Sequence, residues 1–169
     1  MIEPFRAFRD LIVTIPGIAT GVADVITAET GADMTRFPTV GHLASWAGTT
    51  PGSNESAGRV KWTKTRTGNP YLKAALGTAA MSAGRNKDTY LAVKYRRIAA
   101  RRGPVKAIVA VEHAILVAIW NMAQTGEFYA APGPDFYTRL RPDSAKNRAI
   151  AQLRGLGYDV TLNPIPQSA

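Results

Sequence analysis

The sequence predicts an all-α fold: a small helical domain with a helix-hairpin-helix-like element, an exposed basic loop and a C-terminal tail. Three observations support this prediction. The 169 residues are 46% hydrophobic and 20% charged, which is an ordinary globular composition. Apolar residues recur at helical spacing in several segments. Prolines stand where several of those segments begin and glycines where they end, as is typical of helix termini.

The first part of the chain is predicted to hold three short helices. The first covers residues 5–12 and the second residues 21–30, and a Pro-Gly turn at Ile15–Ile18 separates them. Thr39 has the side chain of a helix N-cap, so we expect a third short helix from there to Gly48.

A loop follows these helices, and three longer helices follow the loop. Residues 49–69, named here the serine loop, contain Pro51, three glycines and few strong helix formers. This composition indicates an exposed loop, with a hairpin expected around Arg59–Thr63. The later helices are predicted at 70–82, 87–101 and 105–124. The last is apolar on nearly all sides, so it should be the buried central helix.

The composition changes after Ala131, where two prolines and a glycine follow one another closely. We therefore expect a domain at residues 1–131 and a loosely attached tail at 132–169. The tail is predicted to contain a basic amphipathic helix at 144–156 and is a candidate for a short strand at 158–162.

Positive charge is concentrated in one central block. Between Arg59 and Lys106 there are thirteen Lys or Arg residues and a single acid, Asp88, so this block carries +12 while the rest of the chain sums to −3. Most charge runs are solvated helix faces, but this ratio is too one-sided for that interpretation. It favours binding to a polyanion such as nucleic acid.

The segment Ile15–Ala23 resembles the helix-hairpin-helix motif of DNA repair and recombination proteins. A tight turn at Gly17 would expose backbone N–H groups that hold a DNA phosphate without reading its sequence. Ala19 stands where that motif usually has its second glycine. The alternative is that the turn only packs two helices together, and the sequence favours neither interpretation.

Several short motifs follow one another in a fixed order along residues 13–129. They are Ile-Pro-Gly-Ile at 15–18, Phe37, Gly48–Pro51, Ser56–Arg59 and the run Thr65–Lys73, which contains Gly-Asn. In this order they resemble the C-terminal transposase domain of the insertion-sequence one-ten family. Any one of these motifs alone would be a weak indication, whereas the ordered set is specific.

The resemblance implies an RNA-guided DNA recombinase in which a serine attacks a DNA phosphodiester and becomes covalently joined to it. Carried onto this sequence, that serine is Ser56, and Arg59 stands where lysine is commoner in the family. The resemblance also implies a structured guide RNA, a homo-oligomer and a RuvC-like domain whose acids hold a divalent metal such as Mg²⁺. We expect that domain to precede Met1, so this chain would be a C-terminal piece or the product of a truncated gene, inactive alone.

The residues around Ser56 suit this chemistry. A serine hydroxyl is a poor nucleophile without help, and nearby cations could hold a phosphate and stabilise its developing charge. Trp62 could stack on a base. The alternatives are a turn serine without chemistry and, as the weaker nucleophile candidate, Ser53. The predicted DNA- or RNA-binding residues are Gly17, Arg59, Lys61, Trp62, Lys64, Arg66, Asn69, Lys73, Arg96, Arg97, Arg101 and Arg102.

Other classes of protein are disfavoured. The absence of cysteine excludes thiolate catalysis, disulfides and sulfur-based zinc sites. No acids and histidines have metal-ligand spacing, so we expect no metal or other cofactor in this chain. The apolar run 107–120 is too short for a bilayer and no signal peptide is visible, which predicts a cytoplasmic protein without membrane contact. Two alternatives stay open: a non-catalytic nucleic-acid-binding module, and a regulator that joins the full-length transposase and inhibits it.

Overall fold

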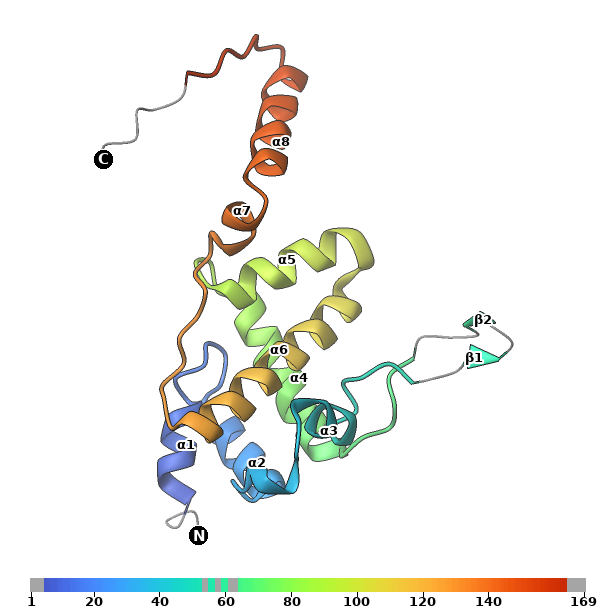
Figure 1. Cartoon of the computed structure of the whole chain (residues 1–169), viewed down its shortest axis with the longest axis vertical. Coiled ribbons are helices and arrows are strands. Elements are labelled where there is room, and N and C mark those ends of the chain that lie inside the picture. Colours follow the sequence, from blue (N-terminus) through green and yellow to red (C-terminus); the bar gives the residue numbers. More distant parts are fainter. Residues whose placement is uncertain (1–4, 53–54, 57–58, 61–63, 164–169) are drawn as a thin grey trace. The chain divides into compact units, whose positions relative to one another are not determined.

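The computed structural model describes residues 5–52, 55–56, 59–60 and 64–163, and the chain divides after Pro134 into two compact units. The first unit confirms the all-α prediction, since its only strands among the described residues are two residues long (Figure 1). Its elements are α1 (Arg6–Ile12), α2 (Thr20–Thr30), the 3-10 helix η2 (Met34–Arg36), α3 (Val40–Trp46), β1 (Glu55–Ser56), β2 (Arg59–Val60), α4 (Pro70–Arg85), α5 (Tyr90–Arg102) and α6 (Pro104–Thr125).

Three α-helices of this unit begin at a side-chain N-cap. Thr39, Asn69 and Thr89 each accept a hydrogen bond from the backbone N–H three residues further on, at the start of α3, α4 and α5. The Thr39 cap confirms the sequence prediction. Helix α5 begins at Tyr90, three residues later than predicted, because the hydroxyl of Thr89 caps it.

Helix α6 is the central helix of the first unit, as predicted. It packs against α3, α4 and α5, and also contacts α1 and η2 (Figure 1). Its first turn is exposed, with Val105 73% exposed, and Ala107 is its first buried residue. The buried side chains of α6 are Ala107, Val111, Glu112, Ile115, Leu116, Ile119 and Met122.

By length and composition, α6 is also the one helix among the described residues that could cross a membrane. The core helix of a folded domain passes the same test, because both environments select apolar side chains. Here the helix packs against other helices and buries the acid Glu112, which is the behaviour of a core helix.

The turn between α1 and α2 is fixed by close packing at Gly17. This residue has a φ of +100°, and a Cβ added to it would lie 2.4 Å from the carbonyl oxygen of Ala79 and 2.8 Å from the Cβ of Ala83. Only glycine therefore fits between this turn and α4. Ala19, which replaces the motif's second glycine, adopts a φ of −84° that suits alanine. Helix packing accounts for the turn, and phosphate binding by it stays a prediction.

The second unit, Asp135–Ala169, contains two helices where one was predicted. They are α7 (Phe136–Leu140) and α8 (Pro142–Gly155), and neither buries a residue. The candidate strand at 158–162 was wrong, since these residues form no strand. A strand requires a hydrogen-bonded partner, and the described residues of this unit are helical or irregular.

Candidate nucleic-acid and catalytic site

The two ends of the serine loop are paired with each other. The backbone N–H of Gly52 donates to the carbonyl oxygen of Lys64 at 2.9 Å, and that of Arg66 donates to the carbonyl oxygen of Thr50 at 3.3 Å. Between them, Pro51 and Thr65 form an antiparallel bridge. These paired segments, residues 48–52 and 64–69, are named the loop foot. Because its ends are paired, the serine loop leaves the helical domain from one defined place.

Two motif glycines close the loop foot. Gly48 has a φ of +71°, and a Cβ on it would lie 2.7 Å from the backbone nitrogen of Gly68. A Cβ on Gly68 would lie 2.3 Å from the backbone nitrogen of Gly48 and 2.4 Å from the carbonyl carbon of Ala47. The two chains therefore touch backbone to backbone. This contact explains why both family motifs, at 48–51 and 65–73, contain a glycine at this place.

Asn69 fastens the loop foot to three helices. Its side-chain oxygen accepts the backbone N–H of Leu72 at the start of α4, and its side-chain nitrogen donates to Glu29 Oε2 of α2 at 2.6 Å. Its backbone N–H donates to the carbonyl oxygen of Trp46 at the end of α3. Asn69 was predicted to contact nucleic acid, whereas here both ends of its amide hold the protein together.

Lys73 links the loop foot to the core. Its Nζ donates to the hydroxyl of Thr65 at 3.1 Å. Its charge also acts on Glu112, a buried acid of α6 that is 4% exposed. Burial raises the pKa of the Glu112 carboxyl, and the charge of Lys73 opposes that rise. Gly77 leaves room for this carboxyl, since a Cβ there would lie 3.4 Å from Glu112 Oε1.

Ser56 lies in β1, in register with Arg59 of β2. The antiparallel pairing places the Cα of Ser56 opposite that of Arg59 and the Cα of Glu55 opposite that of Val60. The pairing begins before the segment Arg59–Thr63 in which the hairpin was predicted. Figure 1 shows β1 and β2 beyond the loop foot, away from the helices of the first unit. Two other predicted contact residues, Lys61 and Trp62, lie outside the described residues, as does Ser53.

The remaining predicted cations fall into two groups. Lys64 and Arg66 are exposed on the loop foot. The other group is on α5, where Arg101 and Arg102 are exposed in the last turn. A helix C-terminus favours positive charge, so the position of these two arginines also stabilises the helix.

Two further arginines of α5 have partners within the protein. Arg96 donates to the carbonyl oxygens of Asn86 at 3.2 Å and Lys87 at 2.7 Å, which satisfies carbonyl groups just beyond the end of α4. Arg97 is half-buried and also has a partner. The sequence pattern alone does not distinguish these two arginines from Arg101 and Arg102.

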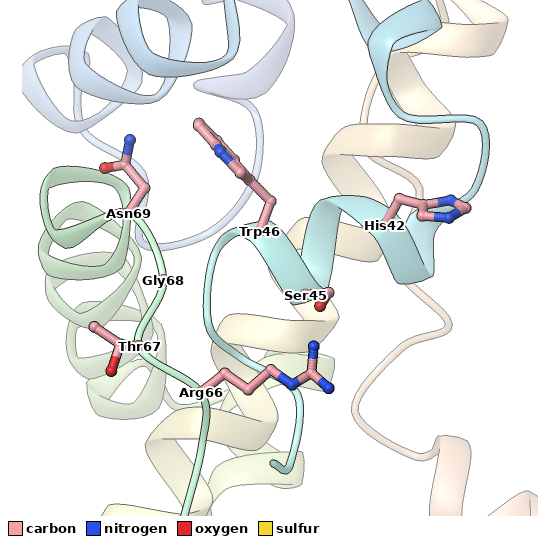
Figure 2. A pocket seen from close by; sticks show the side chains of 7 residues that line it. All are labelled: His42, Ser45, Trp46, Arg66, Thr67, Gly68 and Asn69. Atoms are coloured by element: carbon pink, nitrogen blue, oxygen red, sulfur yellow. The ribbon is translucent and has the colours of Figure 1, made fainter. Parts of the chain in front are cut away.

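A cavity that the sequence did not reveal lies beside the loop foot. Its volume is about 600 Å³. Figure 2 shows Trp46 and Asn69 pointing to the same side, while the side chain of Arg66 reaches from the loop foot toward α3. Its wall therefore combines one aromatic ring, one guanidinium and several hydroxyl and amide groups. The lining residues are His42, Ser45, Trp46, Arg66, Thr67, Gly68 and Asn69.

Within the part of the chain that the structure describes, no three His, Cys, Asp or Glu residues come together as metal ligands. The two histidines are held separately. His42 contacts the Thr39 hydroxyl through its Nδ1, and His113 lies in α6, where burial and then the charge of Lys94 lower its pKa.

Comparison with known proteins identifies the class of protein. The model of the Transposase IS116/IS110/IS902 family matches residues 9–96, which run from α1 into α5 and include the serine loop and its foot. This match covers more than half of the chain. The protein belongs to this transposase family.

One relative shows how much of such a protein this chain represents. It is the insertion element IS110 uncharacterized 43.6 kDa protein of Streptomyces coelicolor, which is 29% identical over 126 residues. The aligned region covers 73% of this chain and 31% of the relative. The chain thus spans about a third of the length of the curated relative that it matches.

Proposed function

We propose that this chain is the DNA-binding, catalytic-serine part of a cytoplasmic transposase. Membership of a transposase family implies DNA as the partner. The observation that carries the proposal is that the motifs around Ser56 form one construction: the glycines of two motifs touch, and Asn69 ties them to α2, α3 and α4. A loop mounted in this way on a rigid scaffold is a common place for catalytic residues.

The proposed reaction is a phosphoryl transfer to serine. The Oγ of Ser56 forms a bond to phosphorus, and the bond from phosphorus to one sugar oxygen breaks. The serine proton is lost and the departing sugar oxygen gains a proton, so that no oxidation or reduction occurs. Arg59, which is in register with Ser56, supplies positive charge where negative charge develops on the phosphate. Rejoining reverses these steps with another sugar hydroxyl.

The proposed binding of DNA rests on positive charges that contact phosphates and do not distinguish one base sequence from another. Lys64, Arg66, Arg101 and Arg102 are exposed, and such side chains neutralise phosphates without distinguishing bases. Arg96, Arg97, Asn69 and Lys73 have partners within the chain and would contribute mainly by holding the surface in shape.

The proposed function also requires partners in addition to DNA. They are a structured guide RNA, further copies of the protein and a RuvC-like domain, to which we assign the divalent metal because the family resemblance places the acidic ligands in that domain. Alone, the chain is expected to bind DNA without recombining it.

The test is the replacement Ser56→Ala, assayed together with a supplied RuvC-like domain, guide RNA and Mg²⁺. A covalent protein–DNA adduct requires the serine oxygen, so the adduct trapped by denaturation should be lost. The free energy of unfolding, measured by thermal unfolding, should change by less than about 0.5 kcal/mol, because loop substitutions of this size have small effects. Ser53→Ala, in the same loop, is the matched control and should retain most of the adduct. An adduct that forms at the wild-type rate in Ser56→Ala would make the loop a binding element only.

A further inference from the structure

We infer that the cavity beside the loop foot binds one unpaired nucleotide of the DNA strand, with its base on Trp46 and its phosphate on Arg66. This inference rests on the proposed function, because it assigns a binding site to the strand that reaches Ser56. The cavity is open to solvent, as a site for one nucleotide of a longer strand must be, and it is lined by the groups that recognise nucleotides: an aromatic ring, a guanidinium, hydroxyls and an amide.

The aromatic side of the cavity is held in place. Trp46 is 37% exposed, and its ring centroid lies 5.4 Å from that of Phe37 with the two planes tilted by 46°. Phe37 is held in turn, since its carbonyl oxygen accepts the indole N–H of Trp120 in α6 at 3.0 Å. A ring packed on one side and exposed on the other is suited to stacking with a base, because little side-chain freedom is lost on binding.

The cationic side is fixed through the backbone. Arg66 is exposed, and its backbone N–H donates to Thr50 across the loop foot. No ion pair involving Arg66 occurs among the described residues, which leaves its guanidinium available to a phosphate. Glu29, an acid that contacts the lining residue Asn69, accepts a hydrogen bond from the side chain of Asn69. The two recognition groups are thus placed by α3 and by the loop foot before any strand arrives.

The position of the cavity fits a strand that reaches Ser56. Ser56 is the sixth residue after Thr50 of the loop foot, and an extended chain of that length spans at most about 20 Å. This is roughly six nucleotides at the B-form spacing of 3.4 Å, and fewer for an unpaired strand, in which the nucleotides can lie further apart. A nucleotide held in the cavity would therefore fix the strand within about six nucleotides of the scissile phosphate.

The experiment measures binding of the whole chain to two short single-stranded DNA oligonucleotides by fluorescence anisotropy. One is oligothymidine and the other has the same backbone without bases. Stacking on one aromatic residue contributes roughly 1–3 kcal/mol, so the wild type should bind the abasic strand about tenfold more weakly through Trp46 alone. In Trp46→Ala, the ratio of the affinities for oligothymidine and for the abasic strand should be about tenfold smaller than in the wild type. Any contribution of Trp62 to this ratio is the same in both proteins and cancels when they are compared. An unchanged difference in Trp46→Ala would overturn the inference.

Three further variants keep the test decisive. Trp46→Phe retains an aromatic ring against Phe37 and should recover most of the base-dependent binding, which a merely misfolded variant would not. Phe128→Ala removes an aromatic residue that is 70% exposed outside the cavity, and it should leave the difference intact. Arg66→Ala should weaken binding to both oligonucleotides alike and make the dependence on salt shallower by about one phosphate contact. A base-specific loss in Arg66→Ala, or a tenfold loss in Phe128→Ala, would contradict the assignment.

Two further measurements complete the experiment. One distinguishes failure of this inference from failure of the proposed function, and the other distinguishes binding of DNA from binding of RNA. Ser56→Ala should show the same Trp46-dependent difference, because stacking requires no nucleophile. If the adduct forms at Ser56 but the difference is insensitive to Trp46, only the cavity assignment fails. If the difference is present and no adduct forms, only the nucleophile fails. A Trp46-dependent difference found with the ribonucleotide strand and not with the DNA strand would overturn the assignment to DNA.

Discussion

Helices α6 and α8 begin in the same way and are buried very differently. Both have proline in the first turn, and both carry apolar residues at helical spacing. Yet α6 buries seven side chains, whereas α8 buries none and leaves Leu153 43% exposed. The signals that begin a helix are local, while burial depends on how much of its circumference is apolar and on what packs against it. The two helices therefore predict opposite responses to the same kind of substitution.

The largest effect is expected for Leu116→Ala in α6. Leu116 is fully buried in the core, so its truncation removes apolar contacts and leaves a cavity that the neighbouring helices fill only in part. The free energy of unfolding should fall by about 2–5 kcal/mol, measured by denaturant titration. A loss below about 1 kcal/mol would mean that α6 is not tightly packed and that its difference from α8 is small.

A smaller effect, an increase in the free energy of unfolding, is expected for Glu112→Gln in the same helix. Glu112 Oε2 is buried and has no hydrogen-bond partner among the described residues. Because burial raises the pKa of this carboxyl above its ordinary 4.5, the unfolded chain loses the proton first as the pH rises. Glu112 therefore lowers stability progressively above pH 4.5, until the pKa of the folded state has been passed.

At pH 7, Glu112→Gln should accordingly raise the free energy of unfolding by about 1 kcal/mol, because it removes the charge and keeps the shape. The gain should disappear when unfolding is measured below pH 4.5, where the carboxyl is protonated in both states. A large loss of stability at pH 7 would instead show that attraction between Glu112 and Lys73 outweighs the burial of the charge.

The smallest effect is expected for Leu153→Ala in α8. This leucine is 43% exposed and α8 buries no residue, so truncation removes little apolar contact. The free energy of unfolding, obtained from thermal unfolding of the chain, should change by under about 0.5 kcal/mol. A loss comparable to that of Leu116→Ala would show that α8 is packed in solution against a surface that buries Leu153.

The sequence predicted elements that depend on local chemistry. Thr39, Pro70 and Pro104 mark helix starts by their side chains or by their fixed φ, and each helix begins where such a residue allows it. The candidate strand at 158–162 failed because β structure depends on a partner strand, which local composition does not specify. The same reason explains why the short pairing of β1 with β2 was placed too late in the chain.

The sequence motifs predicted which segment contains the candidate site, but they did not predict how its side chains are arranged in space. The order of motifs located the serine loop, and its assignment of Ser56, Asn69 and Lys73 to the site stays a prediction, but it did not reveal what Asn69 and Lys73 contact within the protein. Their partners, Glu29 and Thr65, are 40 and 8 residues away in sequence, and no periodic pattern joins them. Trp46 was overlooked because local sequence does not show that it lines the same cavity as Arg66, which comes from a different part of the chain. The sequence signal for Glu112 was that it is the one acid in the mostly apolar helix α6.

The contact between Gly48 and Gly68 limits how this part of the protein can evolve. Residues that touch through side chains can drift together, one growing as the other shrinks, but here each backbone occupies the space that the other's Cβ would need. No paired substitution relieves that crowding. The residues between the two glycines are under no such restriction, because each doubling of a flexible loop's length adds only about 0.6 kcal/mol to its closure. Loop closure therefore tolerates changes of length outside the segment that carries Ser56, while the two anchoring positions stay glycine.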